Sequence, residues 1–180
     1  MAILPFEHAV VELENKIKEL RHLSNDTKID ILQEIRKLES KQAKLMHQIY
    51  SNLTPWQKVQ VARHTERPKL ASYIQGLIID FVPLKGDRCF GEDAALTVGL
   101  GTFRGQSVMI MGHEKGHDTD SRVHHNFGMP KPEGYRKATR AMKLADRFGI
   151  PIVSFIDTAG AHPGLEAEER GQAEAIATSI

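Results

Sequence analysis

The chain carries two different hydrophobic patterns, one before residue 52 and one after residue 81. From Pro5 to Asn52 apolar residues recur at spacings of three and four among Glu, Lys and Gln. This spacing places side chains along one face of a helix. A break with good cap and turn residues, Ser24–Lys28, separates two such stripes. The pattern predicts an antiparallel helical hairpin, which we assign to residues 1–53 as one domain.

The predicted hairpin has two possible uses. Its apolar stripe could pack on itself as a solvated, coiled-coil-like arm, or it could dock a partner subunit. Both uses need the same face, so the sequence leaves them open.

Residues 54–180 have the pattern of a second domain, of mixed α/β type. Glycine becomes frequent after residue 81, and the apolar runs become short, as in buried strands. A strand, a crossover helix and a second strand are typical of an α/β sheet. The predicted elements are a capped helix from Thr54 to about His64, a helix within Glu66–Ile78, strands Ala94–Phe103 and Ser107–Gly112 joined by a turn at Arg104 and Gly105, a helix within Pro132–Gly149, a buried strand Pro151–Ile156 and a helix from Leu165 to the end.

Composition narrows the function. With 24 Lys and Arg against 23 Asp and Glu, the chain has no net charge that would attract nucleic acid or an anionic membrane. One cysteine, Cys89, excludes an internal disulfide framework, and the start lacks the pattern of a signal peptide. No apolar run approaches the ~20 residues of a membrane span. We therefore expect a cytoplasmic protein.

The stretch FIDTAGAHPG, Phe155–Gly164, places a glycine loop after the last predicted strand. Open α/β sheets bind ligands at the carboxyl ends of their strands, and amides in such loops can hold a ligand oxygen. Alternatively, Gly160 and Gly164 only permit the backbone angles of a tight turn. Spacing alone does not decide between these interpretations.

A second candidate region runs from Asp120 to Ala138. Its cations Arg122, Arg136 and Lys137 flank Phe127 and Tyr135, which suits a phosphorylated or carboxylated ligand, although exposed cations are usually a solvated face. The nearby histidines lack metal-ligand spacing, so we expect them to face solvent. They are His113, His117, His124 and His125. The motifs G-x-S-x-G, P-loop and G-x-G-x-x-G are missing from the sequence, which removes support for three common enzyme classes.

Six stretches of the sequence are informative as an ordered set. They are TPWQKVQVARHTERP, GDRCFGEDAA, GHEKG, NFGMPKPEGYRKA, FIDTAGAHPG and EERGQAEAIA. Together they resemble the alpha subunit of the carboxyltransferase of bacterial acetyl-CoA carboxylase. The resemblance extends to Ile180, and the order of the stretches makes it more specific than any one of them.

This resemblance implies a crotonase-like fold of stacked ββα units, present in part, in a heterotetramer with a zinc-ribbon-bearing beta subunit. The family transfers a carboxyl group from carboxybiotin, on the biotin carboxyl carrier protein, to acetyl-CoA and makes malonyl-CoA for fatty-acid synthesis. Biotin carboxylase is a further implied partner, and no metal is expected in this chain. The reaction develops negative charge on an enolate and on the ureido oxygen of biotin, so fixed donors are needed for both.

The resemblance also implies site residues. Gly160 and Ala161 are the candidate catalytic residues, through their backbone amides. The candidate carboxybiotin and CoA pocket comprises His162, Gly164, Phe127, Gly128, Tyr135 and Arg136. Alternatively, the two aromatic residues only pack and the arginine only pairs with a carboxylate. The family usually has Pro where Ala159 stands and Tyr where His162 stands, which bears on local loop contacts and not on the family.

Family members continue through a further glycine-rich block beyond Ile180, so we expect a truncated chain that is inactive alone. Two alternatives remain. A stand-alone acyl-CoA hydratase or isomerase of the crotonase type would need its own Glu or Asp base. A docking scaffold would use the helical arm and leave the α/β half inert.

Overall fold

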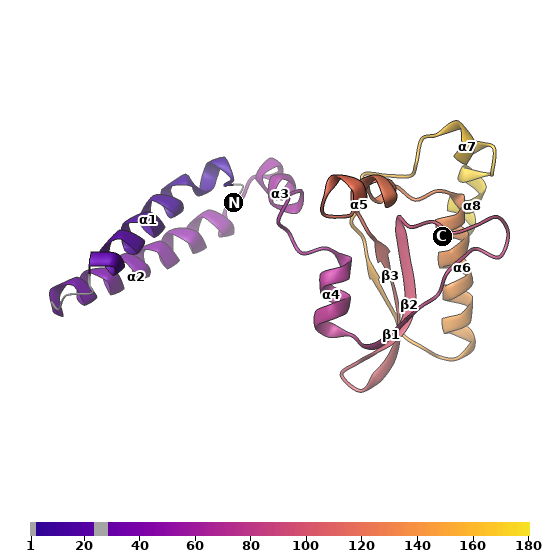
Figure 1. Cartoon of the computed structure of the whole chain (residues 1–180), viewed down its shortest axis with the longest axis horizontal. Helices are drawn as coiled ribbons and strands as arrows, with labels where there is room; N and C mark the ends of the chain where they lie inside the picture. Colours follow the sequence, from indigo (N-terminus) through magenta and orange to yellow (C-terminus); the bar gives the residue numbers. More distant parts are fainter. Residues whose placement is uncertain (1–2, 24–28) are drawn as a thin grey trace. The chain divides into compact units, whose positions relative to one another are not determined.

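The computed structural model describes residues 3–23 and 29–180 (Figure 1). The chain divides into two compact units, residues 1–67 and 68–180, which are described separately. This division does not test the predicted functional boundary between residues 53 and 54, which stays a prediction.

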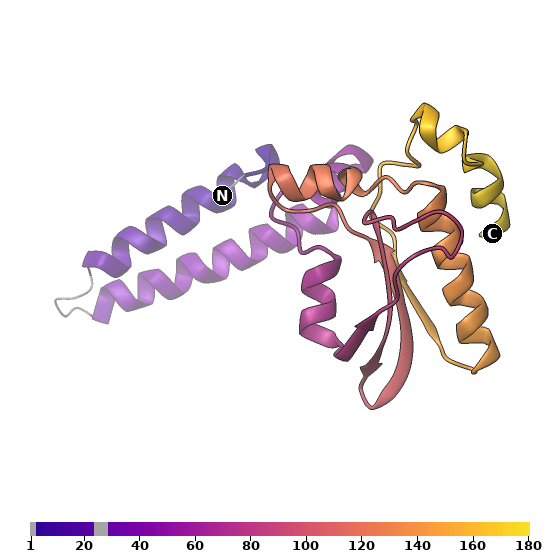
Figure 2. The same ribbon diagram turned by 45° about the vertical axis from the view of Figure 1, so that its right-hand side comes forward.

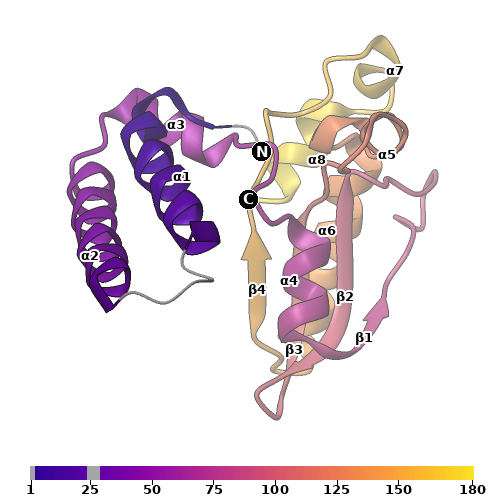
Figure 3. The ribbon, with the colours of Figure 1, turned by 60° about the vertical axis from the view of Figure 1, so that its left-hand side comes forward.

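Unit 1 is helical. It contains a short 3-10 turn, Pro5–Glu7, and the helices α1, His8–Leu23, α2, Ile29–Ser51, and α3, Pro55–Ala62. Helices α1 and α2 lie side by side (Figures 2 and 3). Their buried side chains come from the predicted stripes: Val10, Leu13, Ile17 and Ile35. The turn predicted over Ser24–Lys28 lies outside the described residues, so the complete hairpin stays a prediction.

Two polar contacts link α2 to α1 and to the 3-10 turn before it. Arg21 Nη2 lies 2.6 Å from Glu39 Oε1, and the Tyr50 hydroxyl donates to Glu7. The Glu7 hydrogen bond, with burial, raises the pKa of Tyr50 to about 12. At the start of α3, Thr54 and Gln57 bond each other's backbone amides in a capping box ahead of Pro55, which confirms the predicted cap.

Unit 2 is a four-stranded sheet with the order β1-β2-β3-β4 (Figure 3). The strands are β1, Ile79–Pro83, β2, Leu96–Phe103, β3, Gln106–His113, and β4, Ile152–Phe155. The helices are α4, Leu70–Leu77, α5, Thr119–His124, α6, Pro132–Arg147, α7, Leu165–Glu168, and α8, Gln172–Thr178, with a 3-10 turn at Asn126–Gly128.

Two strand pairings define the sheet. Strands β2 and β3 are antiparallel, with Phe103 opposite Gln106, and the predicted turn residues Arg104 and Gly105 both have positive φ, 50° and 80°. Positive φ at both positions is typical of the tight turn whose twist matches a hairpin, so the predicted hairpin is confirmed. After α6 the chain returns in β4, parallel to β3.

The sheet is covered on both faces, and β3 is buried on both. Met109 and Met111 point to α6, where three alanines let the helix approach closely. Val108 and Ile110 point to the other face, where Leu70 of α4 packs. Figure 1 shows α4 and α6 on opposite sides of the strands. Side chains in a strand alternate between faces, which explains the continuous apolar run of β3.

Several predicted elements need correction. Strand β1 and helix α5 were not expected, and the final helix is broken at Gly171, which has φ 78°. Strand β4 is an edge strand and is not fully buried, because Ile152 is 42% exposed. Strand β1 escaped prediction because it has a bulge between Ile79 and Val82 and ends on proline, which breaks the alternation of a regular strand.

We predict that Met109→Ala destabilises unit 2 by about 2–5 kcal/mol, because it leaves a cavity between β3 and α6. Its register partner Ile152 is partly exposed and serves as the control, and Ile152→Ala should cost less than about 1 kcal/mol. Native-state hydrogen exchange of the β3 amides measures both values for unit 2 alone. Equal effects of the two substitutions would contradict the described core.

Candidate functional site

The parallel pairing of β3 and β4 brings the ends of both strands to one edge of the sheet. The chain leaves β3 through His113, Glu114 and Lys115, and it leaves β4 through the glycine loop, residues 157–164. Ligand sites of open α/β sheets lie at such an edge. The structure therefore places the predicted loop where the sequence pattern expected it.

The glycine loop begins on two contacts from the end of β3. The Asp157 amide lies 3.4 Å from His113 Nδ1 and can donate to it, and the Asp157 carboxylate forms an ion pair with Lys115. A Cβ at Gly128 would lie only 2.6 Å from Lys115 Cγ, and Gly128 has φ 75°. Glycine at position 128 therefore gives Lys115 the room to reach Asp157. No spacing in the sequence points to Lys115, because its partner lies 42 residues away.

The same loop is tied to the segment 126–131, which precedes α6. Thr158 Oγ1 lies 2.6 Å from the Gly128 carbonyl oxygen, and the His162 amide donates to the Pro130 carbonyl oxygen at 3.0 Å. From α8, Gln172 Nε2 donates to the same carbonyl at 3.0 Å. Two segments that lie about 30 positions apart in the sequence thus form one structure.

The candidate loop residues differ in what they offer a ligand. Gly160 has φ 146°, and a Cβ there would meet open space. Its amide, however, donates to Thr158 Oγ1 at 3.0 Å. The Ala161 amide donates to no acceptor within the described part of the chain. Of the two amides proposed as catalytic donors, the Ala161 amide is therefore the one with a free hydrogen.

His162 and Gly164 form a closed corner of the loop. His162 Nε2 lies 2.8 Å from Glu166 Oε1, and Lys131 Nζ lies 3.5 Å from the same oxygen. A Cβ at Gly164 would come within 2.3 Å of His162 Nε2 and 2.4 Å of Glu166 Oε2. A side chain at position 164 would therefore collide with the hydrogen-bonded side chains of His162 and Glu166.

The aromatic candidates lie at different depths. Phe127 is 52% exposed and has φ 55°, an uncommon angle for a large side chain. It directly precedes Gly128, the residue that Thr158 contacts. Tyr135 is half-buried on α6, and burial raises its pKa. Phe127 is thus the candidate with an accessible ring.

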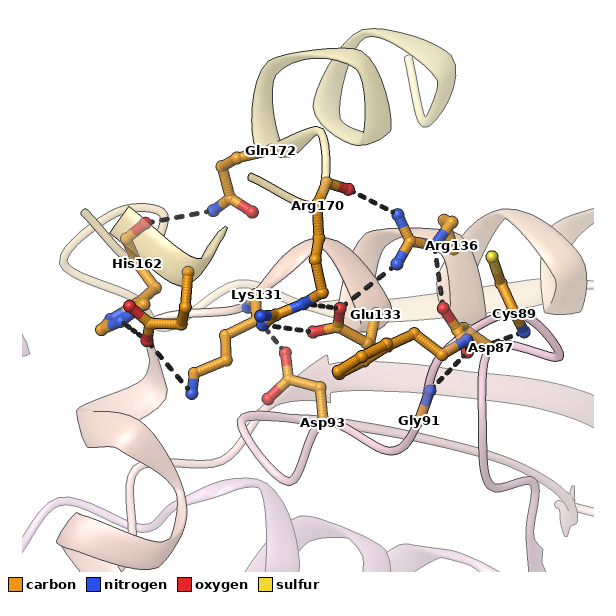
Figure 4. A network of polar contacts seen from close by, with 12 residues as sticks. Asp87, Cys89, Gly91, Asp93, Lys131, Glu133, Arg136, His162, Arg170 and Gln172 are labelled. Carbon is orange, nitrogen blue, oxygen red and sulfur yellow. Dashed lines mark hydrogen bonds and ion pairs between the residues drawn. The ribbon is translucent and has the colours of Figure 1, made fainter. Parts of the chain in front are cut away.

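Arg136 belongs to a network of buried charges (Figure 4). Its Nε lies 2.8 Å from Asp87 Oδ2, and its Nη2 lies 3.2 Å from Glu133 Oε1. The Arg170 Nε lies 2.6 Å from Glu133 Oε1 as well. These contacts match the alternative in which Arg136 pairs with carboxylates, and a direct contact with ligand stays a prediction.

Asp87 organises the loop before β2. Its Oδ1 accepts hydrogen bonds from three successive amides, those of Cys89, Phe90 and Gly91, at 3.0, 2.8 and 2.9 Å. Burial opposes ionisation of this carboxyl, but the amide donors and Arg136 outweigh it and hold its pKa below the ordinary value. The loop therefore closes around one charge. The sequence alone gives no spacing rule that identifies such a network.

Lys137 and two of the histidines are less exposed than expected. Lys137 is 1% exposed and bonds Glu92 and the Asp93 carbonyl oxygen, so it is not a solvated cation.

His125 Nδ1 lies 2.6 Å from the Ala94 carbonyl oxygen, and His113 is partly buried, so the expectation that these two histidines face solvent is wrong. The side chain of His117 is 81% exposed. Within residues 3–23 and 29–180, His, Cys, Asp and Glu form no group suited to a metal ion.

A cavity of about 390 Å³ opens on the α4 side of the sheet. Leu70, Ile74 and Phe81 form its apolar wall, and Glu114 and His125 are among its polar lining residues. The Glu114 carboxylate is occupied, because it accepts hydrogen bonds from the Ala71 and Gly116 amides at 3.1 and 3.0 Å. No residue of the glycine loop lines this cavity.

The fold and the placement of the loop define a mixed α/β protein with a loop at the shared carboxyl ends of two parallel strands. The crystal structure of transcarboxylase 12S, with hydrolysed methylmalonyl-coenzyme A bound, is similar in fold at a TM-score of 0.51 and 20% identity, over 64% of this chain and 21% of that chain. Residues 3–180 match the family described as acetyl co-enzyme A carboxylase carboxyltransferase-like, and the chain belongs to this family.

Two relatives are named acetyl-coenzyme A carboxylase carboxyl transferase subunit alpha. The protein of Paramagnetospirillum magneticum is 62% identical, and that of Rhodospirillum centenum is 61% identical. Each alignment covers 100% of this chain but 57% of the relative. The chain therefore spans little more than half the length of these relatives. In its described residues, no helix is both long and apolar enough to cross a bilayer.

We predict that His113 makes the stability of the chain depend on pH. Burial lowers its pKa, against the opposing effects of the Phe155 carbonyl and Asp157. The unfolded state, with an imidazole pKa of about 6.5, therefore binds a proton before the folded state does. The contribution of partly buried His113 to folding stability is therefore intact above the pKa of the unfolded state. It is lost as the pH falls from that pKa toward the lower pKa of the folded state.

Urea unfolding between about pH 8 and about pH 5 measures this dependence. Glutamine at position 113 has no titratable group, so His113→Gln should make the free energy of unfolding less dependent on pH. The control His117→Gln changes an exposed position and should leave that dependence unchanged. The same slope in His113→Gln as in the unsubstituted chain would contradict the prediction.

We also predict that Glu133→Gln destabilises unit 2 by about 1–3 kcal/mol. The substitution removes a carboxylate that is 2% exposed and that Arg136 and Arg170 share, while Arg136 keeps its contact with Asp87. The control Glu14→Gln breaks an exposed pair with Lys18 on α1 and should cost less than about 0.5 kcal/mol. Urea unfolding measures both changes. A loss below about 1 kcal/mol in Glu133→Gln would show that the network is not stabilising.

Proposed function

We propose that this chain is part of the alpha subunit of acetyl-CoA carboxylase carboxyltransferase. The subunit would take part in transferring the carboxyl group of carboxybiotin, carried on the biotin carboxyl carrier protein, to acetyl-CoA to give malonyl-CoA. Family membership over residues 3–180 supports this proposal. The observation that carries the proposal is the glycine loop at the carboxyl ends of β3 and β4, in which the Ala161 amide is free to donate.

The chemistry of the site fits an anionic ligand. The Ala161 amide is a neutral donor, and the space beside Gly160 is open. The charge of Lys115 at the base of the loop is balanced by Asp157, so the donors left for an anion are the backbone amides. Neutral amides can stabilise developing negative charge without exchanging a proton, and a fixed loop does not have to reorganise during the reaction. Carboxybiotin would supply the carboxyl group, and the loop would hold and orient the oxygen that gains charge.

The assembly is part of the proposal. Residues 54–180 would be the N-terminal part of a crotonase-like domain. The chemistry would need the remainder of that domain and the beta subunit of an alpha2beta2 complex. The amphipathic helices of residues 1–53 would form the arm that docks a partner. Biotin carboxylase would recharge the carrier protein, and the complex would work in the cytoplasm in fatty-acid synthesis.

The alternatives have less support. A stand-alone hydratase would need a free carboxylate base at the pocket. The nearest loop carboxylates are engaged, Asp157 with Lys115 and Glu166 with His162 and Lys131. A pure scaffold would not need the ordered loop amides. Neither alternative explains the family match over both units.

A chimeric subunit tests the proposed function. Residues 1–180 of this chain would replace the matching part of the Paramagnetospirillum magneticum relative, and the chimera would be purified with that organism's beta subunit. Decarboxylation of malonyl-CoA with biocytin as the carboxyl acceptor is measured for the chimera complex, for this chain alone and for the beta subunit alone. We expect turnover only in the complex, because the loop forms just one wall of the site.

Hydration of crotonyl-CoA by the same preparations is the matched control. A folded chimera complex without carboxyl transfer would remove the proposed function. Hydration by the chain alone would instead favour the hydratase.

A further inference from the structure

We infer that Thr158 is the positioning residue of the glycine loop and that it makes Ala161, rather than Gly160, the loop residue whose amide faces the ligand. This inference rests on the proposed function only for its catalytic consequence. The assignment of the two amides rests on the hydrogen bonds of Thr158 and His162.

The first argument comes from the hydrogen bonds of the Thr158 hydroxyl. Its oxygen lies 2.6 Å from the Gly128 carbonyl oxygen and 2.9 Å from the Gly160 carbonyl oxygen. A hydroxyl has one hydrogen to donate but can accept as well. The shorter distance assigns the donated bond to Gly128, and the Gly160 amide donates to the same hydroxyl at 3.0 Å. Thr158 thus joins the loop to the segment before α6.

The second argument concerns the shape of the loop. Gly160 has φ 146°. Glycine has no Cβ and can adopt many other backbone angles, so a contact is needed to hold this one. The bond from its own amide to Thr158 is such a contact. Two residues later, the His162 amide is held by the Pro130 carbonyl oxygen. Ala161 lies between these two anchored amides and, in the described chain, donates to no acceptor.

The third argument is that the hydroxyl and not the methyl group makes these bonds. Serine at position 158 keeps the hydroxyl, and valine keeps the shape while removing it. Thr158→Val would free the Gly160 amide and release the loop from Gly128. A loop donor displaced by about 1 Å can slow a reaction about 100-fold.

Amide hydrogen exchange measured by NMR on the chain tests the assignment. We expect slow exchange at Gly160 and fast exchange at Ala161 in the unsubstituted chain and in Thr158→Ser. In Thr158→Val the Gly160 amide should exchange about tenfold faster or more, since its acceptor is gone. The β3 amides, measured in the same spectra, show whether unit 2 remains folded. Fast exchange at Gly160 in the unsubstituted chain, or a protected Ala161 amide, would overturn the assignment.

Carboxyl transfer by the chimera complex tests the catalytic consequence. We expect Thr158→Val to lower kcat about tenfold or more, with little change in the KM for malonyl-CoA. Thr158→Ser keeps the hydroxyl and should keep the kcat of the unsubstituted complex. The control Thr139→Val removes a hydroxyl that bonds the Tyr135 carbonyl oxygen on α6 and should leave kcat unchanged.

The results separate the two proposals. Full kcat in Thr158→Val overturns the positioning role while the proposed function stands. If the unsubstituted complex has no transferase activity, the proposed function and this catalytic role fall together, and the exchange data still decide which amide the loop leaves free.

Discussion

The parallel pairing of β4 with β3 is the constraint on which the candidate site depends. Four successive residue pairs, from Met109 with Ile152 to Gly112 with Phe155, fix the point at which each strand ends. This register sets His113 and Lys115 beside Asp157, the first residue of the glycine loop. A shift of one residue would turn every side chain of β4 to the opposite face, and the loop would lose both anchors.

Buried charges complete the support around the loop. Glu133 joins Arg136 to Arg170, and Arg136 reaches Asp87, so α6, the loop before β2 and the segment before α8 share one network. Asp93 accepts the Lys131 amide at 2.8 Å next to the start of α6, where Gly134 leaves room for it. Burial raises the pKa of Asp93, although the amides of Ala95 and Lys131 act to lower it. Such groups are costly to desolvate, so their value here lies in fixing positions as much as in stability.

Local rules of the sequence were sufficient where the structure is local. The Arg104–Gly105 turn, the Thr54 cap and the crossover helix all follow from spacing and turn chemistry. Strand β1 was missed because its bulge and Pro83 hide its period, and the break at Gly171 was missed because one left-handed residue leaves helical spacing intact on both sides. Lys115, Thr158 and Glu133 act across separations of 30 to 42 residues, which no periodicity reports. Only the three-dimensional fold brings these residues together with their partners.

Lys137 carries a consequence for chemical modification. Its ammonium group lies under α6 with Glu92 and the Asp93 carbonyl, and the residue is 1% exposed. A lysine amine reacts as the nucleophile toward an acyl donor, and the burial of Lys137 keeps such a donor from reaching it in the folded protein. An acyl group on Lys137 would therefore show that α6 had at some time moved away from Glu92 and Asp93. The acyl group would also keep α6 from packing back completely, because the site has no room for the added atoms and needs the positive charge.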